Sequence, residues 1–241
     1  MRIPRIYTSQ ELVADQHIEL EEKPSHHLSK VLRLKEGAPI ILFNGRGNQY
    51  HAIIDSIGKK NLSINIKECE ATNNESPLHI HLGIAVSKGD RMDWVIQKAT
   101  ELGVNSISPL FSMRSEVRLK GDRAEKKIQH WQQVAISACE QSGRTLIPTV
   151  NNIQQLSHWV RESNADKKLV LHHRTDETLE DHQSVSRVAL LIGPEGGLDT
   201  KEIMLAEESG FEALALGPRV LRTETAPLAA ITLLQKAWGD F

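Results

Sequence analysis

Two short polar loops near the C-terminal end contain the side chains best suited to chemistry. The first, GPEGG at 193–197, has Glu195 among glycines, and the second, GPRVLRTET at 217–225, contains Arg222 and Glu224. A carboxylate can accept a proton, and a guanidinium can stabilise a negative charge that develops during a reaction. Glycines let the backbone approach a ligand closely because they carry no side chain. Together the two loops predict an active site.

The elements that precede these loops should be buried parallel strands. Each loop follows an apolar run, at 188–192 and at 213–216, that is too short for a helix and ends at Gly-Pro. Unbroken apolar runs of this length are typical of strands buried on both faces. In open α/β sheets, the loops beyond the carboxyl ends of the strands form the ligand crevice. The first loop does not match GxGxxG, because Pro194 fills the wrong position, so it does not indicate a phosphate site.

The remaining pattern divides the chain into a small β domain, 1–72, and an α/β domain, 73–241, with a polar stretch at their boundary. Alternating apolar residues and Gly/Asn turns at 39–43, 49–57 and 62–68 favour an antiparallel meander. A helix is predicted at 24–34, and its inner face would consist of His27, Leu28, Val31 and Leu32. In the larger domain, strands are predicted at 78–86, 106–111 and 168–171, and helices at 87–102, at 126–141 and from Ala226 onward.

Composition excludes some classes of protein and leaves others open. No apolar run approaches the roughly 18 residues of a membrane span, and the N-terminus lacks the apolar core of a signal peptide, so we expect a cytoplasmic protein. Cys69 and Cys139 have no CxxC spacing, which favours two buried, reduced thiols, and no histidine pattern indicates a metal. The net charge of −2 does not indicate nucleic-acid binding, and residues 1–72 hold ten Lys and Arg against nine Asp and Glu.

Longer motifs carry a resemblance to a known family. IGPEGGL followed by LGPRVLRTETA resembles the paired C-terminal motifs of the SPOUT methyltransferases. The segments MRIPRIY, QKATELGV, ISACEQSGR and LRTETAPLAAI are similar to the ribosomal RNA small-subunit methyltransferase E family, over nearly the whole chain. The resemblance implies a SPOUT-type α/β trefoil-knot domain with an N-terminal PUA-like or OB-like β-barrel that binds RNA. It also implies S-adenosyl-L-methionine as cofactor, 16S ribosomal RNA of the small subunit as substrate, methylation at N3 of one uridine, and a homodimer with its interface on helices 92–102 and 226–238.

The resemblance also implies where the cofactor binds. The cofactor-binding residues would be Leu171, His172, Ile192, Gly193, Gly196, Gly197, Leu216, Gly217, Val220 and Leu221. His173 stands where the family often has proline, so the sequence departs from the family pattern just after the predicted strand 168–171.

The catalytic and RNA-binding residues are less narrowly defined. Uridine N3 bears a proton that must leave, so Glu195 and Glu224 are candidate bases and Arg222 and Arg144 candidate anion stabilisers. The sequence does not choose among these four. The candidates for RNA binding are Arg2, Arg5, Lys30, Arg33, Arg46, Lys98, Glu140 and Gln141.

Two other functions stay open at this point. One is a SPOUT methyltransferase that acts on a different position of ribosomal or transfer RNA. The other is an RNA-binding assembly factor that keeps the fold without catalysis. The second alternative predicts degraded cofactor loops, whereas both loops keep their glycines and charged residues.

Overall fold

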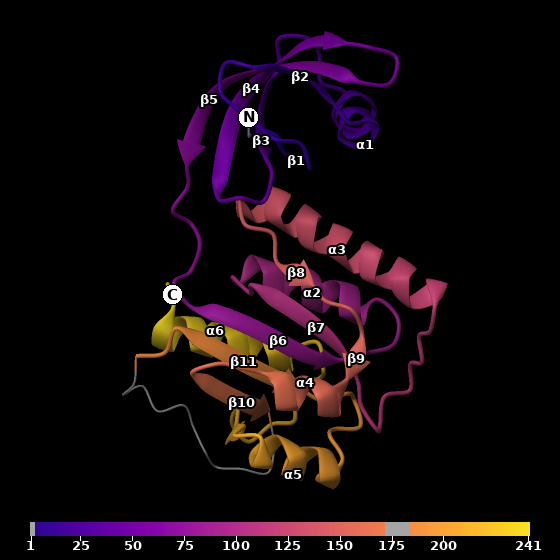
Figure 1. Ribbon diagram of the computed structural model, residues 1–241, viewed down its shortest axis with the longest axis vertical. Coiled ribbons are helices and arrows are strands. Elements are labelled where there is room, and N and C mark those ends of the chain that lie inside the picture. The colour runs from indigo at the N-terminus through magenta and orange to yellow at the C-terminus, as the bar shows by residue number, and fades with distance from the viewer. Residues whose placement is uncertain (1–2, 172–183) are drawn as a thin grey trace. The chain divides into compact units, whose positions relative to one another are not determined.

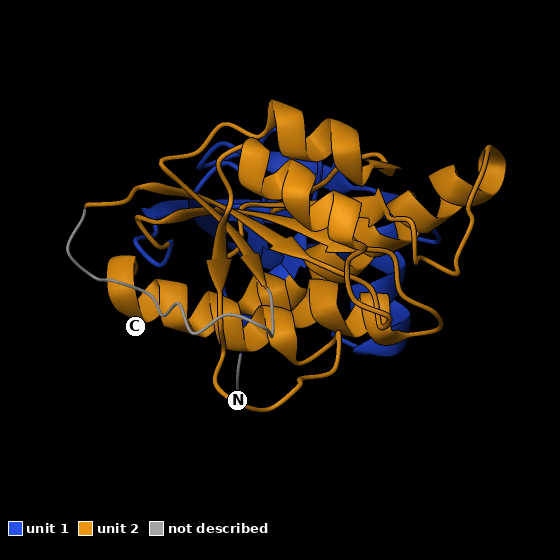
Figure 2. Ribbon diagram, turned by 90° about the horizontal axis from the view of Figure 1, so that it is seen from below, with its two compact units in different colours: residues 1–75, 139–147 blue, residues 76–138, 148–241 orange. Residues whose placement is uncertain are grey.

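The computed structural model describes residues 3–171 and 184–241, and these residues form two compact units (Figures 1 and 2). Unit 1 consists of residues 1–75 and 139–147, and unit 2 of residues 76–138 and 148–241. Arg2, His172 and His173 lie outside the described residues. No helix in the described ranges is long and apolar enough to cross a membrane.

Unit 1 is built on a five-stranded sheet with the order β1-β3-β4-β5-β2. The predicted meander is confirmed, because β3 (Pro39–Phe43), β4 (Asn48–Ile57) and β5 (Leu62–Ala71) pair antiparallel in sequence order. Two strands that the sequence did not predict complete the sheet: β1 (Arg5–Tyr7) pairs parallel with β3, and β2 (His17–Leu20) pairs antiparallel with β5. Alternate residues of these strands, including Leu42, Ile54 and Ile64, form the buried core of the unit.

The predicted helix at 24–34 is wrong in its geometry. The chain forms a short helix, α1 (Glu22–His26), and then a π-helical turn, η1 (His27–Val31). A π turn contains more residues than an α turn, so the inner face shifts out of the 3.6-residue period used for the prediction. Leu28 is buried as predicted, but His27, Val31 and Leu32 are exposed. The prediction of two buried thiols is also wrong, because Cys139 is buried and Cys69 is exposed, although both are free.

A segment distant in sequence completes unit 1. The last residues of α3 (Asp122–Ser142) and the stretch that follows them belong to this unit. Within it, the guanidinium of Arg144 donates to Glu75 at 2.7 and 3.0 Å, and Asn74 Nδ2 donates to the carbonyl of Gly143 at 2.6 Å. The sequence had predicted residues 139–147 as part of the larger domain. The predicted domain boundary after residue 72 stays a prediction.

Unit 2 is an α/β unit with a parallel sheet in the order β12-β10-β11-β6-β7-β8, and β9 also pairs with β7. The predicted strands are confirmed as β6 (His79–Ala85), β7 (Ser106–Phe111), β10 (Lys167–Leu171), β11 (Arg187–Ile192) and β12 (Glu212–Leu214). Two short strands, β8 (Thr149–Val150) and β9 (Gln154–Gln155), complete the sheet. Every pairing between these strands is parallel.

Helices cover both faces of this sheet. One face packs against α2 (Arg91–Glu101), α3 and α6 (Ala226–Trp238), and the other against α4 (Leu156–Glu162) and α5 (Thr200–Glu208). In β11, Leu190 belongs to the first core and Leu191 to the second. The unbroken apolar run is therefore explained by burial on both faces.

The order of the strands reverses next to β6. From β6 the chain proceeds outward through β7 to β8, whereas β11 returns to pair with the other edge of β6. The carboxyl ends of β6 and β11 are therefore neighbours at a topological switch point, the usual place of ligand binding in open α/β sheets. The trefoil knot stays a prediction.

A buried polar cluster surrounds His81 of β6, on the face of the sheet that packs against α4 and α5. Both Ser108 Oγ, at 2.8 Å, and Trp159 Nε1, at 3.1 Å, lie within hydrogen-bonding distance of His81 Nε2. An indole nitrogen can only donate, so Nε2 must accept and carry no proton. Burial lowers the pKa of His81 to about 4. The neutral ring is therefore the form compatible with this packing.

The cluster predicts a pH dependence of stability. The unfolded His81 titrates near 6.5 and the folded one near 4, so the unfolded state binds more protons between these values and stability falls as pH decreases through them. The loss reaches at most about 3 kcal/mol, since one pKa unit corresponds to about 1.4 kcal/mol. Urea denaturation from pH 7 to 4.5 should show this slope in the native protein and a flatter one in His81→Gln. The exposed His79 on the same strand is the control, and His79→Gln should keep the native slope.

Candidate functional site

The first predicted loop begins where β11 ends, at Gly193. A Cβ at Gly193 would lie 2.9 Å from Leu198 Cγ and 3.1 Å from Leu198 N, so a larger residue would force the loop open. The loop closes with a hydrogen bond from Gly197 N to the carbonyl of Pro194 at 2.8 Å, and Gly197 has φ +69°. These two glycines are required by the path of the backbone, which leaves Glu195 exposed at the tip.

An arginine that the sequence analysis did not select holds this loop. Arg114 donates from Nη1 to the carbonyl of Gly196 at 3.0 Å and from Nη2 to Asp199 Oδ2 at 3.2 Å. Asp199 also caps α5, since its side chain accepts from Lys201 N while Glu202 accepts from Asp199 N. The hydrogen bond from Lys201 N is the largest of the interactions that lower the pKa of Asp199, and the pair with Arg114 adds to it. Arg114 therefore fixes the C-terminal end of the loop at the start of α5.

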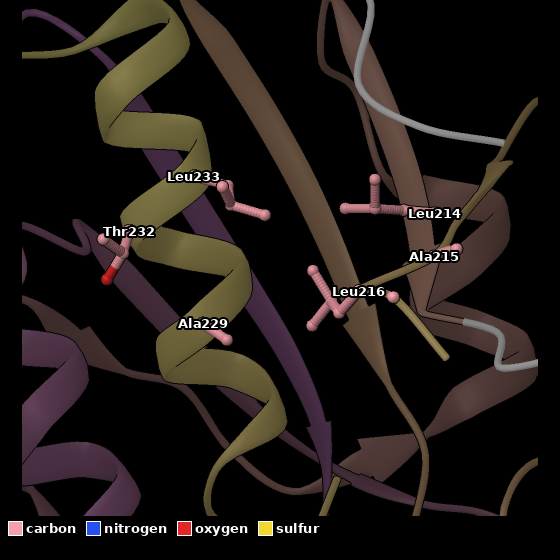
Figure 3. A pocket seen from close by; sticks show the side chains of 7 residues that line it. Leu214, Ala215, Leu216, Ala229, Thr232 and Leu233 are labelled. Atoms are coloured by element: carbon pink, nitrogen blue, oxygen red, sulfur yellow. The ribbon is translucent and has the colours of Figure 1, made fainter. Parts of the chain in front are cut away.

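The second loop borders an open apolar hollow of about 570 Å³ (Figure 3). Its lining consists of Leu214, Ala215, Leu216, Gly217, Ala229, Thr232 and Leu233. The side chain of Leu233 on α6 points toward those of Leu214 and Leu216 across the hollow. Gly217 has φ +82° with no atom within 4 Å of an added Cβ, so its main chain is open to a ligand. The volume and the apolar lining of the hollow suit a flat organic group whose polar edge forms hydrogen bonds with main-chain groups.

A second arginine missed by the sequence analysis connects the two loops. Arg91, the first residue of α2, donates from Nη1 to Glu195 Oε1 at 2.7 Å, and its Nε lies 3.9 Å from Glu224 Oε2. Both predicted carboxylates therefore meet at one cation. A cation in the first turn of a helix opposes the helix dipole, which was the signal in the sequence that could have identified Arg91.

Arg222 lies on the second loop, shortly before the start of α6 at Ala226. Its side chain is exposed, and none of the described residues forms an ion pair with it. Its carbonyl accepts from Thr225 N and Ala226 N, each at 2.9 Å, while the neighbouring Thr223 is buried. The backbone of this residue is thus fixed, while its side chain is exposed to solvent.

The structure brings only part of the predicted set together. The cofactor candidates Ile192, Gly193, Gly196, Gly197, Leu216, Gly217, Val220 and Leu221 all lie on the two loops or at their borders, and Leu171 ends β10, which pairs with β11 and β12. Val220 is 79% exposed. Arg144 belongs to unit 1, where it is buried with Glu75. Among the residues with described positions, no group of three or more His, Cys, Asp or Glu is placed to hold a metal ion.

The RNA-binding candidates differ in how far their side chains are already engaged. The guanidinium of Arg5 lies over Phe43 and donates to Gln49 and, at 2.9 Å, to the carbonyl of Gly143. Glu140 accepts from Tyr7 N at 3.0 Å, and burial raises its pKa. Lys98 pairs with Glu101 at 2.8 Å. The exposed candidates are Lys30, Arg33, Arg46 and Gln141.

Comparison with known proteins adds independent findings. A family model described as an RNA methyltransferase domain matches residues 74–235, and one described as an RNA methyltransferase PUA domain matches residues 20–67. The ribosomal RNA small subunit methyltransferase E of Buchnera aphidicola is 38% identical over 100% of this chain and 96% of its own length. That of Bacillus subtilis is 32% identical over 90% of this chain and 91% of its own length.

Solved structures match over the full length as well. A Legionella pneumophila protein described as a methyltransferase in complex with bound S-adenosylmethionine is 42% identical, with a TM-score of 0.96 and complete coverage of both chains. A ribosomal RNA small subunit methyltransferase E from Neisseria gonorrhoeae, bound to S-adenosyl methionine, is 40% identical with a TM-score of 0.93 and the same coverage.

The anchoring of the first loop can be tested through its capping residue. Asp199→Ala removes the α5 cap and the partner of Arg114, and should lower the free energy of unfolding by about 1 kcal/mol. Asp199→Asn keeps a good capping acceptor and should stay much closer to the native protein, since an exposed ion pair adds little. Urea denaturation of both variants measures the difference. Equal stability of the alanine variant and the native protein would show that the cap contributes nothing.

Proposed function

Because the chain belongs to the ribosomal RNA small-subunit methyltransferase E family, we propose that it transfers a methyl group from S-adenosylmethionine to N3 of a uridine in small-subunit ribosomal RNA. The observation that carries this proposal is an intact glycine loop at the switch point of the sheet, together with an apolar hollow between the end of β12 and α6. Ribosomes occupy the cytoplasm, so the proposed substrate places the protein there.

The hollow fits the cofactor better than it fits a nucleotide phosphate. Leu214, Leu216 and Leu233 offer apolar contacts to an adenine ring, and the open main chain at Gly217 offers hydrogen bonds to its edge. Main chain at Val220 and Leu221 would also contact the adenine, with Ile192, Gly193 and Gly196 opposite, and Leu171 would close the ribose side. When bound, S-adenosylmethionine supplies a methyl group activated by its sulfonium.

Among the four catalytic candidates, the geometry favours Arg222 as the group that stabilises the uridine anion. Its side chain is exposed on the second loop, whereas the guanidinium of Arg144 is buried and paired with Glu75. Glu195 and Glu224 stay candidates for accepting the N3 proton. Arg91 lies beside both carboxylates, so we propose that it positions them and connects the two loops.

The proposed function predicts that cells lacking the protein also lack one modified nucleoside. In cells lacking the protein, mass spectrometry of digested small-subunit RNA should show no N3-methyluridine, and the native gene should restore it. Loss of a different methylated nucleoside would leave the fold assignment intact and make the substrate wrong. If no nucleoside changes and calorimetry detects no heat with S-adenosylhomocysteine, the chain is a non-catalytic factor.

Mass spectrometry of nucleosides can also test the role of Arg222 with purified protein. With subunits from those cells as substrate, Arg222→Ala should lower kcat by about 10²–10³-fold, as the loss of one donor to a developing anion does elsewhere. Binding of S-adenosylhomocysteine should change little. Arg118→Ala removes an exposed arginine from the loop after β7 and is the matched control, which should keep native turnover. An Arg222→Ala variant with native kcat would remove Arg222 from the chemistry.

We also propose that a second copy of the chain covers the exposed side of the hollow. Three apolar side chains of unit 2 are exposed around it and on α2: Val220 at 79%, Leu233 at 44% and Trp94 at 43%. The apolar lining of the hollow would otherwise face water, which favours association.

The dimer predicts a coupled effect on mass and on cofactor binding. Leu233→Glu places a carboxylate at the exposed rim, and should convert the dimer to monomer in sedimentation at micromolar concentration while weakening binding of S-adenosylhomocysteine. Met204→Glu makes the same change on the outer side of α5, where Met204 is 53% exposed, and should leave both properties unchanged. A native protein that sediments as a monomer would contradict the proposal.

A further inference from the structure

Glu202 on α5 is a buried carboxylate that the proposed chemistry does not use. It is only 7% exposed, although glutamates are almost never buried unless they are paired. Its Oε2 accepts from Asp199 N at 2.9 Å, and its Oε1 accepts from Met113 N at 2.8 Å. The first contact belongs to the capping box that begins α5, but a capping box requires neither the second contact nor the burial. The second contact therefore points to a further role.

This second contact reaches a turn at the end of a different strand. Met113 belongs to residues 112–115, called here the β7 turn, which directly follow β7. In the sheet, β6 lies between β7 and β11, so the β7 turn and the glycine loop extend from strands that are not neighbours. The hydrogen bond between Met113 N and Glu202 therefore joins the two connections across the carboxyl end of β6.

The β7 turn has a main chain that is fixed by its own hydrogen bonds. Ser115 Oγ accepts from Ser112 N at 3.2 Å and lies 2.9 Å from Ser112 Oγ. In the reverse direction, Ser115 N donates to the carbonyl of Ser112 at 3.2 Å. Both serines are buried. Because the turn is closed in this way, the N–H of Met113 is held in place for the carboxylate.

The same turn contacts the glycine loop at a second position. Arg114 donates from Nη1 to the carbonyl of Gly196 at 3.0 Å, and its Cβ and Cδ lie 3.7 Å from the position of a Cβ added at Gly196. Two consecutive residues of the turn are thus attached on either side of the end of the loop, Met113 to α5 and Arg114 to Gly196. Two such contacts fix the course of the main chain between them.

We propose that Glu202 is a positioning residue for the cofactor. By joining the β7 turn to the start of α5, it holds the main chain of the glycine loop in the conformation that binds S-adenosylmethionine, and it takes no part in the methyl transfer. A loop that is ordered before binding loses less conformational entropy when the ligand arrives. The inference rests on the proposed function, because the ligand of the loop is the proposed cofactor.

Glu202→Gln in the full-length protein tests this role with little change in side-chain volume. The amide nitrogen of glutamine only donates, so one of the two backbone N–H groups loses its acceptor. Calorimetry should show that S-adenosylhomocysteine binds about tenfold more weakly, which is the effect expected when about one residue becomes ordered only on binding. The KM for S-adenosylmethionine should rise while kcat at saturation stays native, because the contact supports binding and not the chemical step.

Two control variants separate this role from a general loss of stability. Asp166 Oδ2 also accepts from two backbone N–H groups, those of Ser186 at 3.1 Å and Arg187 at 2.9 Å, at the opposite end of β11 from the glycine loop. Asp166→Asn therefore disturbs the same kind of contact on the same strand, and should keep native affinity. Met113→Ala removes a side chain that is 59% exposed but keeps the backbone donor, and should also bind natively.

A second variant keeps the test decisive if Glu202→Gln does not fold. Ser115→Ala removes the hydroxyl that accepts from Ser112 N, and so loosens the β7 turn without changing α5. It should weaken binding of S-adenosylhomocysteine several-fold and leave kcat native. Far-UV circular dichroism of each variant shows whether it is folded under the conditions of the binding measurement.

Three outcomes would overturn the inference and leave the proposed function standing. The first is native affinity in folded Glu202→Gln, or in Ser115→Ala if the glutamine variant does not fold. The second is an equal loss of affinity in Asp166→Asn, because affinity would then follow general stability. The third is a lower kcat with an unchanged KM, which would place Glu202 in the chemistry. If the native protein itself does not bind S-adenosylhomocysteine, the proposed function fails and the positioning role fails with it.

Discussion

The candidate site depends on the parallel pairing of β11 with β6 at the centre of the larger sheet. Six residue pairs, from Arg187 with His79 to Ile192 with Ile84, bring the carboxyl ends of the two strands to the same level. Helices bury β11 on both faces, and Leu190 and Leu191 pack into opposite cores. The glycine loop and the first residue of α2 therefore emerge side by side, and the contact between Arg91 and Glu195 follows from the sheet.

The charged side chains of the two loops differ in whether they form ion pairs. Arg91 and Arg114 anchor the glycine loop through Glu195, the carbonyl of Gly196 and Asp199. These ion pairs are partly exposed and contribute little to stability individually. Their value is positional, since they fix the carboxylate of Glu195 and the main chain of the glycine loop. Arg222 on the second loop forms no ion pair with any described residue.

The sequence predicted the parts of this arrangement that depend on local pattern. Buried strands such as 188–192, the alternating strands of unit 1 and both loops have signals within a few residues, and the structure confirms them. Arg91 and Arg114 were missed because their partners lie 104 and 82 to 85 positions away, which no local period reveals. The inner face of residues 24–34 was wrong because a π turn does not follow the α-helical period.

The net charge of the whole chain is not informative about nucleic-acid binding, for a related reason. A value of −2 averages over the chain, whereas a phosphate backbone responds to charge within about a Debye length, near 8–10 Å. Over 13 residues, 23–35 hold four cations without a carboxylate, and nearby acids such as Glu21 and Glu36 are engaged in other hydrogen bonds. A nearly neutral protein can therefore present a strongly basic surface, provided that its fold keeps the acids away.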